Sequence, residues 1–345
     1  MEPPADSQSL NPNPEGLLSA VPADFAVLRG LAGRNILSVK DLARAEIVEL
    51  CRLAAFLERV EIAESKPLDG KIAITAFFEA STRTRTSFES AVLRLDGKII
   101  SIPDGQITGA KKGESLADIG EMFNAYGDLV IMRHTQTDAP EQILQNLRIP
   151  LINAGNGTGE HPTQALADWF ALLKWRPELT EPGAIPNGGL HLGILGTPGS
   201  MRAVKSFLLM ALRFKSNIRR ITVISEMADP FGEGLAEDIR EAGIDYQVTN
   251  EAAECLPDLD VIYMNSITFL GDSYKSLDGS FKLNRASPLK PEAVILHPLA
   301  RLEELSRDLD DTPHNLYFAQ AHGAVFVRQA LLTCLLDRLD RIPED

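Results

Sequence analysis

The residues with the clearest chemistry form one short run, FFEASTRTRTSFESA, at positions 77–91 of the 345-residue chain. Within it, Ser81, Thr82, Arg83 and Thr84 lie where an apolar, strand-like segment gives way to a helical pattern. The first N–H groups of a helix lack partners inside the helix and carry the positive end of its dipole. Three hydroxyls and a guanidinium at such a helix start predict a phosphate site. The alternative is an N-cap at Ser81 flanked by solvated arginines.

Polar residues also follow two other apolar runs. Arg133 and His134 come directly after DLVIM, and His161 and Gln164 open the helical pattern after LINAGNGTGE. Taken singly, each could be a surface residue or a cap. Ligands of parallel α/β sheets bind at the carboxyl ends of the strands, so we expect these side chains to converge with the first group. The nucleotide-binding patterns G-x-x-x-x-G-K-[ST] and G-x-G-x-x-G are absent, and no cluster for a metal or a covalent nucleophile is visible.

Composition excludes several classes of partner. Hydrophobic residues make up 44% and charged residues 24% of the chain, as in ordinary globular proteins. A formal charge of −14 argues against nucleic acid and anionic membranes as partners. No apolar run approaches the roughly 18 to 20 residues that span a bilayer, and the N-terminus lacks the features of a signal peptide. Three widely separated cysteines predict neither a disulfide framework nor a thiolate metal site, and they fit the reducing cytoplasm.

Short apolar runs alternate with helical patterns along the whole chain, which predicts parallel sheets flanked by helices. Before a Pro- and Gly-rich break, strands are expected at 71–78, 98–103, 128–134 and 149–155, and helices at 42–60, 87–96, 114–127 and 161–175. After it, strands are expected at 190–196, 219–225, 260–265 and 293–298, and helices at 202–214, 234–243 and 323–339. The expected fold class is α/β, with two similar-sized domains that each hold a parallel sheet.

The expected domain organisation has four parts. Residues 1–34 form a tail that is Pro-rich and disordered as far as about Pro22. Residues 35–175 form the first domain and residues 176–320 the second. Residues 321–345 contain a C-terminal helix that packs back on the first domain.

Six segments together resemble the aspartate and ornithine carbamoyltransferase family, over about residues 35–340. They are FFEASTRTRTSFE, KKGESLAD, VIMRH, HPTQALAD, ILHPLAR and QAHGAVFVRQALL. The resemblance is closer to the aspartate branch for two reasons. Ornithine enzymes have a cysteine motif in place of HPL at 297–299, and they lack the loop GQITGAKKGESLAD with Lys111 and Lys112, which we call the lysine loop. It implies a carbamoyl-phosphate domain and an amino-acid domain, with no cofactor and no metal.

The resemblance assigns the donor site residue by residue. The segment STRT would bind the phosphate of carbamoyl phosphate, and the arginine after VIM would contact both phosphate and the carbonyl oxygen. The histidine of HPTQ and the second threonine of STRT would donate to that oxygen, while the glutamine of HPTQ holds the carbamoyl amide. The lysine loop would enter a neighbouring subunit's site, which implies a homotrimer. The residues concerned are Ser81, Thr82, Arg83, Thr84, Arg133, His161 and Gln164, with Thr108 and Lys112 from the loop.

The acceptor site departs from the family pattern. Arg202, in GTPGSMR, would bind the acceptor's α-carboxylate. Aspartate enzymes carry T-R-x-Q after the strand that corresponds to DVIYM, but this chain has NSIT, which places Ser266 and Thr268 at the arginine and glutamine positions. A hydroxyl cannot replace the bidentate charged contact of a guanidinium. Either a cation takes over or the acceptor is not aspartate; the candidate cations are Lys112, Lys275, Lys282 and Arg285.

A second departure lies in HPLAR, where the family has HPLPR with a cis bond before the second proline. Ala300 occupies that place, so either the bond stays cis or the loop is reshaped. The carbonyls of Pro298 and Leu299, which the family uses to hold the acceptor amine, lie in the same loop.

Three hypotheses follow. The first is a carbamoyltransferase that uses carbamoyl phosphate, with aspartate as the best single acceptor. The second is the same chemistry with another amine that carries an α-carboxylate for Arg202. The third is a catalytically silent homologue that acts as a structural or regulatory binding protein.

Overall fold

The computed structural model describes residues 11–18, 23–60, 65–105, 108–232, 234–265 and 281–343. The chain divides into two compact units. We call residues 14–167 with 323–345 the STRTR unit, and residues 1–13 with 168–322 the HPLA unit, after the motif that each contains. Two of the three divisions fall inside helices, α7 (Pro162–Trp175) and α11 (Tyr317–Leu335), and the third falls between residues 13 and 14.

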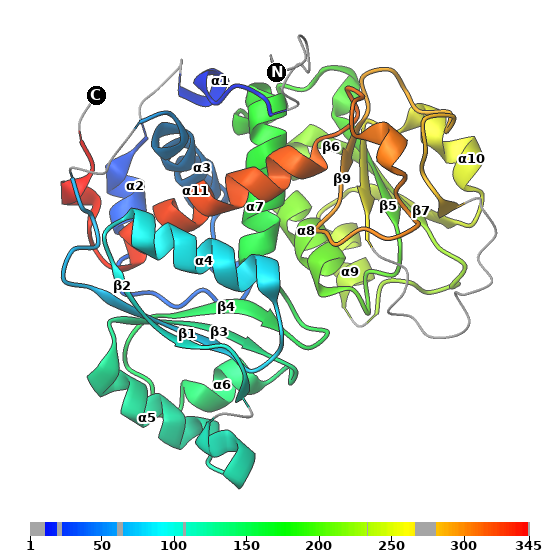
Figure 1. Cartoon of the computed structure of the whole chain (residues 1–345). Helices are drawn as coiled ribbons and strands as arrows, with labels where there is room; N and C mark the ends of the chain where they lie inside the picture. Colours follow the sequence, from blue (N-terminus) through cyan, green and yellow to red (C-terminus); the bar gives the residue numbers. More distant parts are fainter. Residues whose placement is uncertain are drawn as a thin grey trace, which may run out of the picture. The chain divides into compact units, whose positions relative to one another are not determined.

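The STRTR unit is built on a four-stranded sheet whose neighbouring strands all run parallel, in the order β2-β1-β3-β4. Its strands are β1 (Ile72–Phe77), β2 (Lys98–Ile102), β3 (Leu129–His134) and β4 (Leu151–Asn156). Figure 1 shows α5 and α6 on one face of this sheet and α4 on the other. The unit's helices are α1 (Glu15–Leu18), α2 (Phe25–Arg29), α3 (Arg44–Arg59), α4 (Thr82–Arg94), α5 (Leu116–Tyr126) and α6 (Ala139–Ile143), with parts of α7 and α11.

The HPLA unit holds a five-stranded sheet, again with every neighbouring pair parallel, in the order β7-β6-β5-β8-β9. Its strands are β5 (Leu190–Leu195), β6 (Ile218–Ile224), β7 (Asp245–Thr249), β8 (Val261–Met264) and β9 (Val294–Leu296). The remaining helices are α8 (Arg202–Arg213), α9 (Leu235–Glu241) and α10 (Ala252–Cys255). The strand order places the ends of β5, β8 and β9 side by side, so residues that follow these three strands share one edge of the sheet.

Each sheet has a core of its own. Ile74, Ala76, Val130 and Met132 of the STRTR unit pack with apolar residues of α5 and α6. In the HPLA unit, Ile262 and Ile295 lie in a cluster with Leu195, Met264 and Tyr317. Strands that are buried on both faces read as continuous apolar runs, which is why the sequence located them well.

The α/β fold class is confirmed, and each expected strand and helix appears, with shifts at the ends. The largest shifts are at α4, which begins at Thr82 instead of residue 87, and at α11, which begins at Tyr317 instead of residue 323. The sequence patterns did not predict β7 or the short helices α1, α2, α6 and α10. β7 is an edge strand with a mixed burial pattern, and α6 and α10 have only five and four residues, too few to show a helical period.

The N-terminal segment differs from the expected disordered tail where it is described. Residues Glu15–Leu18 form α1, and Leu17 is 2% exposed. Burying this leucine supplies the apolar contact that a purely polar tail would lack. Asp24 caps α2 by accepting from the N–H of Ala26 at 2.8 Å. None of the helices in the part of the chain that the structure describes has the length and hydropathy needed to cross a membrane.

Candidate active site

The carboxyl ends of β1 and β3 bring the first two groups of polar residues together. Phe77 lies opposite Arg133 in the parallel register, and the N–H of Phe78 donates to the carbonyl of Arg133 at 2.8 Å. His134 lies opposite Asn156 of β4 in the same way. Since the three strands are neighbours, the segments that leave them share one edge of the sheet, as expected for a ligand site of this fold class.

The start of α4 presents its positive end without internal compensation. Ser81 is the N-cap residue in an extended conformation (φ −157°, ψ 107°), but its side chain makes no cap hydrogen bond. The first turn of this 13-residue helix contains no acidic residue. The N–H groups at the helix start are therefore directed toward whatever anion binds there. This geometry favours the phosphate interpretation over a simple N-cap.

The two arginines of STRTR have different surroundings. The guanidinium of Arg85 lies 3.5 Å from Glu89 and 3.5 Å from the hydroxyl of Ser101. Glu89 in turn accepts from Ser101 at 2.7 Å and from Thr75 at 3.0 Å, which ties α4 to the sheet. No carboxylate of a described residue pairs with Arg83, and partial burial lowers the pKa of its guanidinium. Arg83 is thus available to pair with an anionic ligand at the start of this helix.

Thr84 and His161 connect the starts of two helices. The hydroxyl of Thr84 lies 3.3 Å from Nε2 of His161, and the hydroxyl of Thr163 lies 3.5 Å from Nδ1 of the same ring. Thr84 is 6% and His161 4% exposed. The convergence of STRTR and HPTQ, predicted from their places after β1 and β4, is therefore present in the structure. Two donors that meet in a site shielded from water are suited to stabilising a developing oxyanion.

Arg133 has an acidic partner that the sequence reading did not assign. Its guanidinium pairs with the carboxylate of Glu79 at 2.6 Å and donates to the carbonyl of Ala154 at 3.5 Å. Both side chains are largely buried. Glu79 stands in FFEAST, two residues before Ser81. Its position directly after one strand, next to the arginine that ends the neighbouring strand, was the feature from which this ion pair could have been predicted. The ion pair holds the guanidinium at the sheet edge.

A hydrogen-bond network fixes the turn that delivers His161. The amide of Asn153 donates to the carbonyl of Leu37 at 2.8 Å and to Oδ1 of Asn156 at 3.0 Å. Asn156 Oδ1 also accepts from the N–H of Glu160 at 2.9 Å. The Glu160 carboxylate accepts from the hydroxyl of Ser38 at 2.7 Å. The role of these two asparagines could not be predicted from the sequence, because it depends on contacts with the chain near Leu37.

Other predicted residues stand near the site or apart from it. Gln164 lies in the first turn of α7, and its N–H donates to the carbonyl of His161 at 3.0 Å. Thr108 donates to the carbonyl of Gly105 at 2.7 Å, and Lys112 is an exposed residue at the end of the 3₁₀ helix Gly109–Lys112. No described contact joins Thr108 or Lys112 to the Ser81–Thr84 segment.

His134 takes a structural part. Its Nδ1 accepts from the N–H of Gln136 at 3.0 Å, and its ring lies 5.3 Å from that of Phe78. Burial lowers the pKa of His134, against the opposing effect of the charges of Asp138 and Glu79. The neutral ring shapes the loop after β3.

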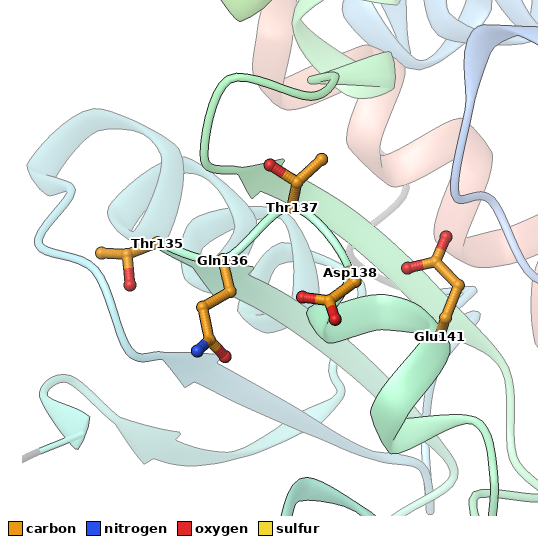
Figure 2. Close-up of a pocket in the computed structure, with 5 residues that line it drawn as sticks. All are labelled: Thr135, Gln136, Thr137, Asp138 and Glu141. Carbon is orange, nitrogen blue, oxygen red and sulfur yellow. The ribbon is translucent and has the colours of Figure 1, made fainter.

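A cavity of about 530 Å³ opens beside this loop (Figure 2). Asp138 lies just before α6 and Glu141 in its first turn. Two carboxylates in its wall oppose phosphate binding, and none of the predicted donor-site residues lines it. The lining residues are Thr135, Gln136, Thr137, Asp138 and Glu141. This cavity therefore does not suit the predicted anion site.

Apart from Lys112, which belongs to the STRTR unit, the described residues of the predicted acceptor site follow strands at one edge of the HPLA sheet. Arg202 is the first residue of α8, which follows β5, while Pro298 and Leu299 follow β9 after His297. The bond between Leu299 and Ala300 is cis. Ser266, Thr268 and Lys275 lie outside the described residues. Asn265, directly before them, follows the end of β8, the strand between β5 and β9.

Two of the cations considered as replacements for the missing arginine are engaged elsewhere. Lys282 pairs with Glu303 at 2.9 Å on the surface. The guanidinium of Arg285 donates to the carbonyl of Asp308 at 3.1 Å. Neither interaction is strong enough to fix the side chain permanently, but both direct these cations toward acidic segments of their own unit.

Within the described residues, no three His, Cys, Asp or Glu side chains gather as a metal site would require. Cys51, Cys255 and Cys334 are thiols without a disulfide. Burial raises the pKa of the Cys51 and Cys334 thiols far above the ordinary range, which makes both unreactive at neutral pH.

Comparison with known proteins is consistent with this geometry. The carbamoyl-P binding domain of aspartate/ornithine carbamoyltransferase matches residues 34–174, and the Asp/Orn binding domain of the same family matches residues 188–335. The aspartate carbamoyltransferase catalytic subunit of Methanopyrus kandleri is 35% identical over 317 residues, covering 90% of this chain and 99% of the relative. That of Thermofilum pendens is 36% identical over 312 residues, covering 88% and 95%.

Solved structures agree. Aspartate transcarbamoylase from Trypanosoma cruzi, crystallised with carbamoyl phosphate and aspartate, superposes with a TM-score of 0.80 at 29% identity, over 89% of this chain and 97% of that one. Its complex with carbamoyl phosphate gives a TM-score of 0.81 at 29% identity, over 90% and 98%. Two domain matches in the expected order, together with relatives that align over nearly their whole length, show that this chain belongs to the aspartate/ornithine carbamoyltransferase family.

Proposed function

We propose that this protein transfers the carbamoyl group of carbamoyl phosphate to the amine of L-aspartate, giving N-carbamoyl-L-aspartate and phosphate. The observation that carries the donor half is the start of α4, where Arg83 stands beside the uncompensated helix end and Thr84 reaches His161 at 3.3 Å. The acceptor half is supported by the relatives, which are named aspartate carbamoyltransferases, and by the complex of the Trypanosoma cruzi enzyme with aspartate.

The chemistry uses binding, orientation and charge. Arg83, Ser81, Thr82 and the helix N–H groups bind the phosphate, and Gln164 holds the carbamoyl amide. The unprotonated amine of the acceptor forms a bond to the carbonyl carbon, and the carbonyl electron pair moves onto oxygen. Arg133, His161 and Thr84 stabilise that oxyanion.

The intermediate then collapses. The carbonyl reforms, the bond between carbon and the phosphate oxygen breaks, and the electron pair leaves with phosphate. The departing phosphate takes the proton that the amine must lose. Holding both substrates in one site supplies the advantage of proximity.

Assembly completes the proposed site. Thr108 and Lys112 make no described contact with the phosphate segment of their own chain, which supports their acting in a neighbouring subunit's site, as the family resemblance implies. We therefore assign a homotrimer with sites shared between subunits. The unbridged cysteines support a reducing compartment, the cytoplasm, as its location.

A second acceptor is favoured by one specific observation. Ser266 and Thr268 stand where aspartate enzymes have an arginine and a glutamine. Losing a charge-assisted contact to the side-chain carboxylate costs about 1.5 to 3 kcal/mol. An amino acid with the same α-carboxylate and a different side chain would avoid that cost. The shared prediction is carbamoyl transfer, and the two candidates differ only in the side chain that the acceptor carries.

The test is acceptor-dependent release of phosphate from carbamoyl phosphate across a panel of amino acids. Turnover with aspartate supports the first candidate, and turnover with another amino acid alone supports the second. Absence of carbamoyl-phosphate binding by calorimetry would overturn both and leave a silent homologue. Arg83→Ala should abolish turnover with any acceptor, while Arg85→Ala, its matched control two residues away, should mainly lower stability, because Arg85 pairs with Glu89.

Ser266→Arg tests the acceptor pocket separately. Restoring the guanidinium should lower the KM for aspartate by about tenfold or more and leave the KM for carbamoyl phosphate as it is. An acceptor profile identical to that of the native protein would show that residue 266 does not face the acceptor.

A further inference from the structure

A network of buried hydrogen bonds holds the loop of residues 297–300, which we call the HPLA loop. His297, directly after β9, is 1% exposed, and its Nε2 lies 3.0 Å from Oε1 of Glu304, which is 5% exposed. The N–H of Leu299 donates to Nδ1 of His297 at 2.9 Å. The N–H of Leu302 donates to the same oxygen of Glu304 at 2.9 Å. The imidazole and the carboxylate thus bind the main chain of the loop at two points.

These contacts determine which ring nitrogen of His297 carries the proton. A ring nitrogen that accepts a hydrogen bond from a backbone N–H carries no proton. His297 therefore holds its proton on Nε2 and donates it to Glu304. The Glu304 carboxylate stays ionised: burial alone would raise its pKa, but the hydrogen bonds from His297 and from the Leu302 N–H hold it below the ordinary value.

The hydrogen-bond network continues from His297 into the core. The N–H of His297 donates to Oε1 of Gln320 at 2.9 Å, and Nε2 of Gln320 donates to Asp168 at 2.5 Å. Asp168 also accepts from the hydroxyl of Tyr263 at 2.9 Å. Gln320, Asp168 and Tyr263 are each no more than 1% exposed. The position of His297 is therefore set by β9 and by a fully buried network, and not by solvent.

The geometry has a consequence for one carbonyl. Pro298 has no N–H, so the first N–H after His297 is that of Leu299. The peptide between Pro298 and Leu299 is trans, and in a trans peptide the N–H and the C=O point in opposite directions. Because the Leu299 N–H is held inward by His297, the Pro298 carbonyl must point out of the loop.

From this we infer that His297 and Glu304, backed by Gln320, Asp168 and Tyr263, are positioning residues that aim the Pro298 carbonyl at the acceptor amine. The inference rests on the proposed function and on the role that the family resemblance implies for this carbonyl, which is to hold the acceptor amine. A buried polar network of this kind is useful where one loop conformation must be selected over others, and a hydrogen bond from the amine to a fixed carbonyl directs the nitrogen lone pair toward the carbamoyl carbon.

His297→Leu removes the acceptor for the Leu299 N–H. The KM for aspartate, or for the acceptor that the panel identifies, should rise about tenfold, the equivalent of one hydrogen bond. Affinity for carbamoyl phosphate, which is bound by the STRTR unit, should stay within twofold. His297→Asn places an amide oxygen near the position of Nδ1 and should recover most of the loss. His191→Leu removes another buried histidine of the same unit, which is 4% exposed and bonded to Thr222, and should not change the acceptor KM.

A merely structural role gives a different result. Loss of folded protein would lower the apparent kcat and leave both KM values alone, and His297→Asn would then not differ from His297→Leu. Either result would overturn the inference. If His297→Leu does not fold, Glu304→Gln carries the test. An acceptor KM within about 1.5-fold of the native value, a difference on the order of the assay error, would then overturn the inference. These failures leave the proposed function intact, whereas a native protein that transfers no carbamoyl group to any amine removes both.

Discussion

Residues of the same type have different roles in the STRTR segment. The family resemblance assigns Arg83 and not Arg85 to the phosphate site, and the two have different surroundings: Arg85 contacts Glu89 and Ser101, whereas no carboxylate of a described residue pairs with Arg83. The threonines divide in the same way: Thr84 is buried against His161, and Thr86 donates to the carbonyl of Thr82 at 2.7 Å within its own helix. Helical geometry decides the roles, because residues two apart lie on different faces.

Thr84→Val keeps the shape of the side chain and removes its hydroxyl. We expect kcat to fall about 10²-fold, because one donor to the oxyanion is lost. Thr86→Val, which removes a hydroxyl bonded only within α4, should leave kcat within about twofold. Steady-state kinetics at saturating substrates measure both values. Equal losses in the two variants would mean that the Thr84 hydroxyl serves the helix and not the reaction.

Arg133→Lys tests whether the geometry of the guanidinium matters beyond its charge. Lysine keeps the charge near Glu79 but cannot form two directed contacts at once. We expect kcat/KM for carbamoyl phosphate to fall by about 10² to 10³. Full activity in this variant would show that only a positive potential is needed at the end of β3.

Among the elements, α7 and α8 are joined by stacked aromatic rings. Trp169 is fully buried, with its ring centroid 4.3 Å from that of Phe214 at an interplanar angle of 10° and 5.9 Å from that of Phe207. Phe207 lies in the middle of α8 and Phe214 is its C-cap residue, so the stacked rings hold the C-terminal half of this helix against α7.

Trp169→Ala should lower the free energy of unfolding by about 3 to 5 kcal/mol, through the lost contact and the cavity that remains. Trp175→Ala is the matched control, because Trp175 is partly exposed beside Arg176 and should cost much less. Urea titration followed by circular dichroism compares the two, and similar midpoints would contradict the packing argument.

A pH dependence is expected at Asp310. The hydrogen bond from Arg301, at 2.6 Å, and that from Tyr317, also 2.6 Å, hold the pKa of Asp310 below its ordinary value. A carboxyl whose folded pKa is depressed stabilises the protein above its unfolded pKa of about 3.9, and this contribution is lost as the pH falls through the folded pKa. Asp310→Asn should thus be less stable than the native protein at pH 7.

The loss at pH 7 should be about 1 to 3 kcal/mol, and the difference should shrink as the pH is lowered below about 4. Urea midpoints across this range measure it. Asp311→Asn, at the exposed neighbouring residue, should follow the native curve. A constant difference at every pH would mean that the charge of Asp310 is not what stabilises this loop.

For the molecule as a whole, the sequence predicted what depends on local pattern and left out what depends on distant contacts. The buried strands and the place of STRTR, VIMR and HPTQ after them were predictable, because apolar runs and helix starts are local features. Glu79 as the partner of Arg133, the asparagines behind His161 and the His297 network were not. Each of these depends on a contact between segments that only the folded chain brings together.

Mixing of two inactive variants tests the shared site. Arg83→Ala and Lys112→Ala should each be inactive alone. In an equal mixture that exchanges subunits, about one quarter of the sites combine a native Arg83 with a native Lys112 from the neighbour, and about that share of activity should return. No recovery, with exchange shown by light scattering of tagged subunits, would place both residues in one chain's site.

The division of labour between the two sheets has an evolutionary consequence. The groups proposed to activate the carbamoyl donor follow β1, β3 and β4, while the described groups proposed for the acceptor, Lys112 apart, follow β5 and β9. Substitutions near the acceptor, such as serine for arginine at position 266, can therefore accumulate without touching the reactive half. In an enzyme with this architecture, single substitutions can therefore change which amine is accepted while the chemistry of carbamoyl transfer is kept.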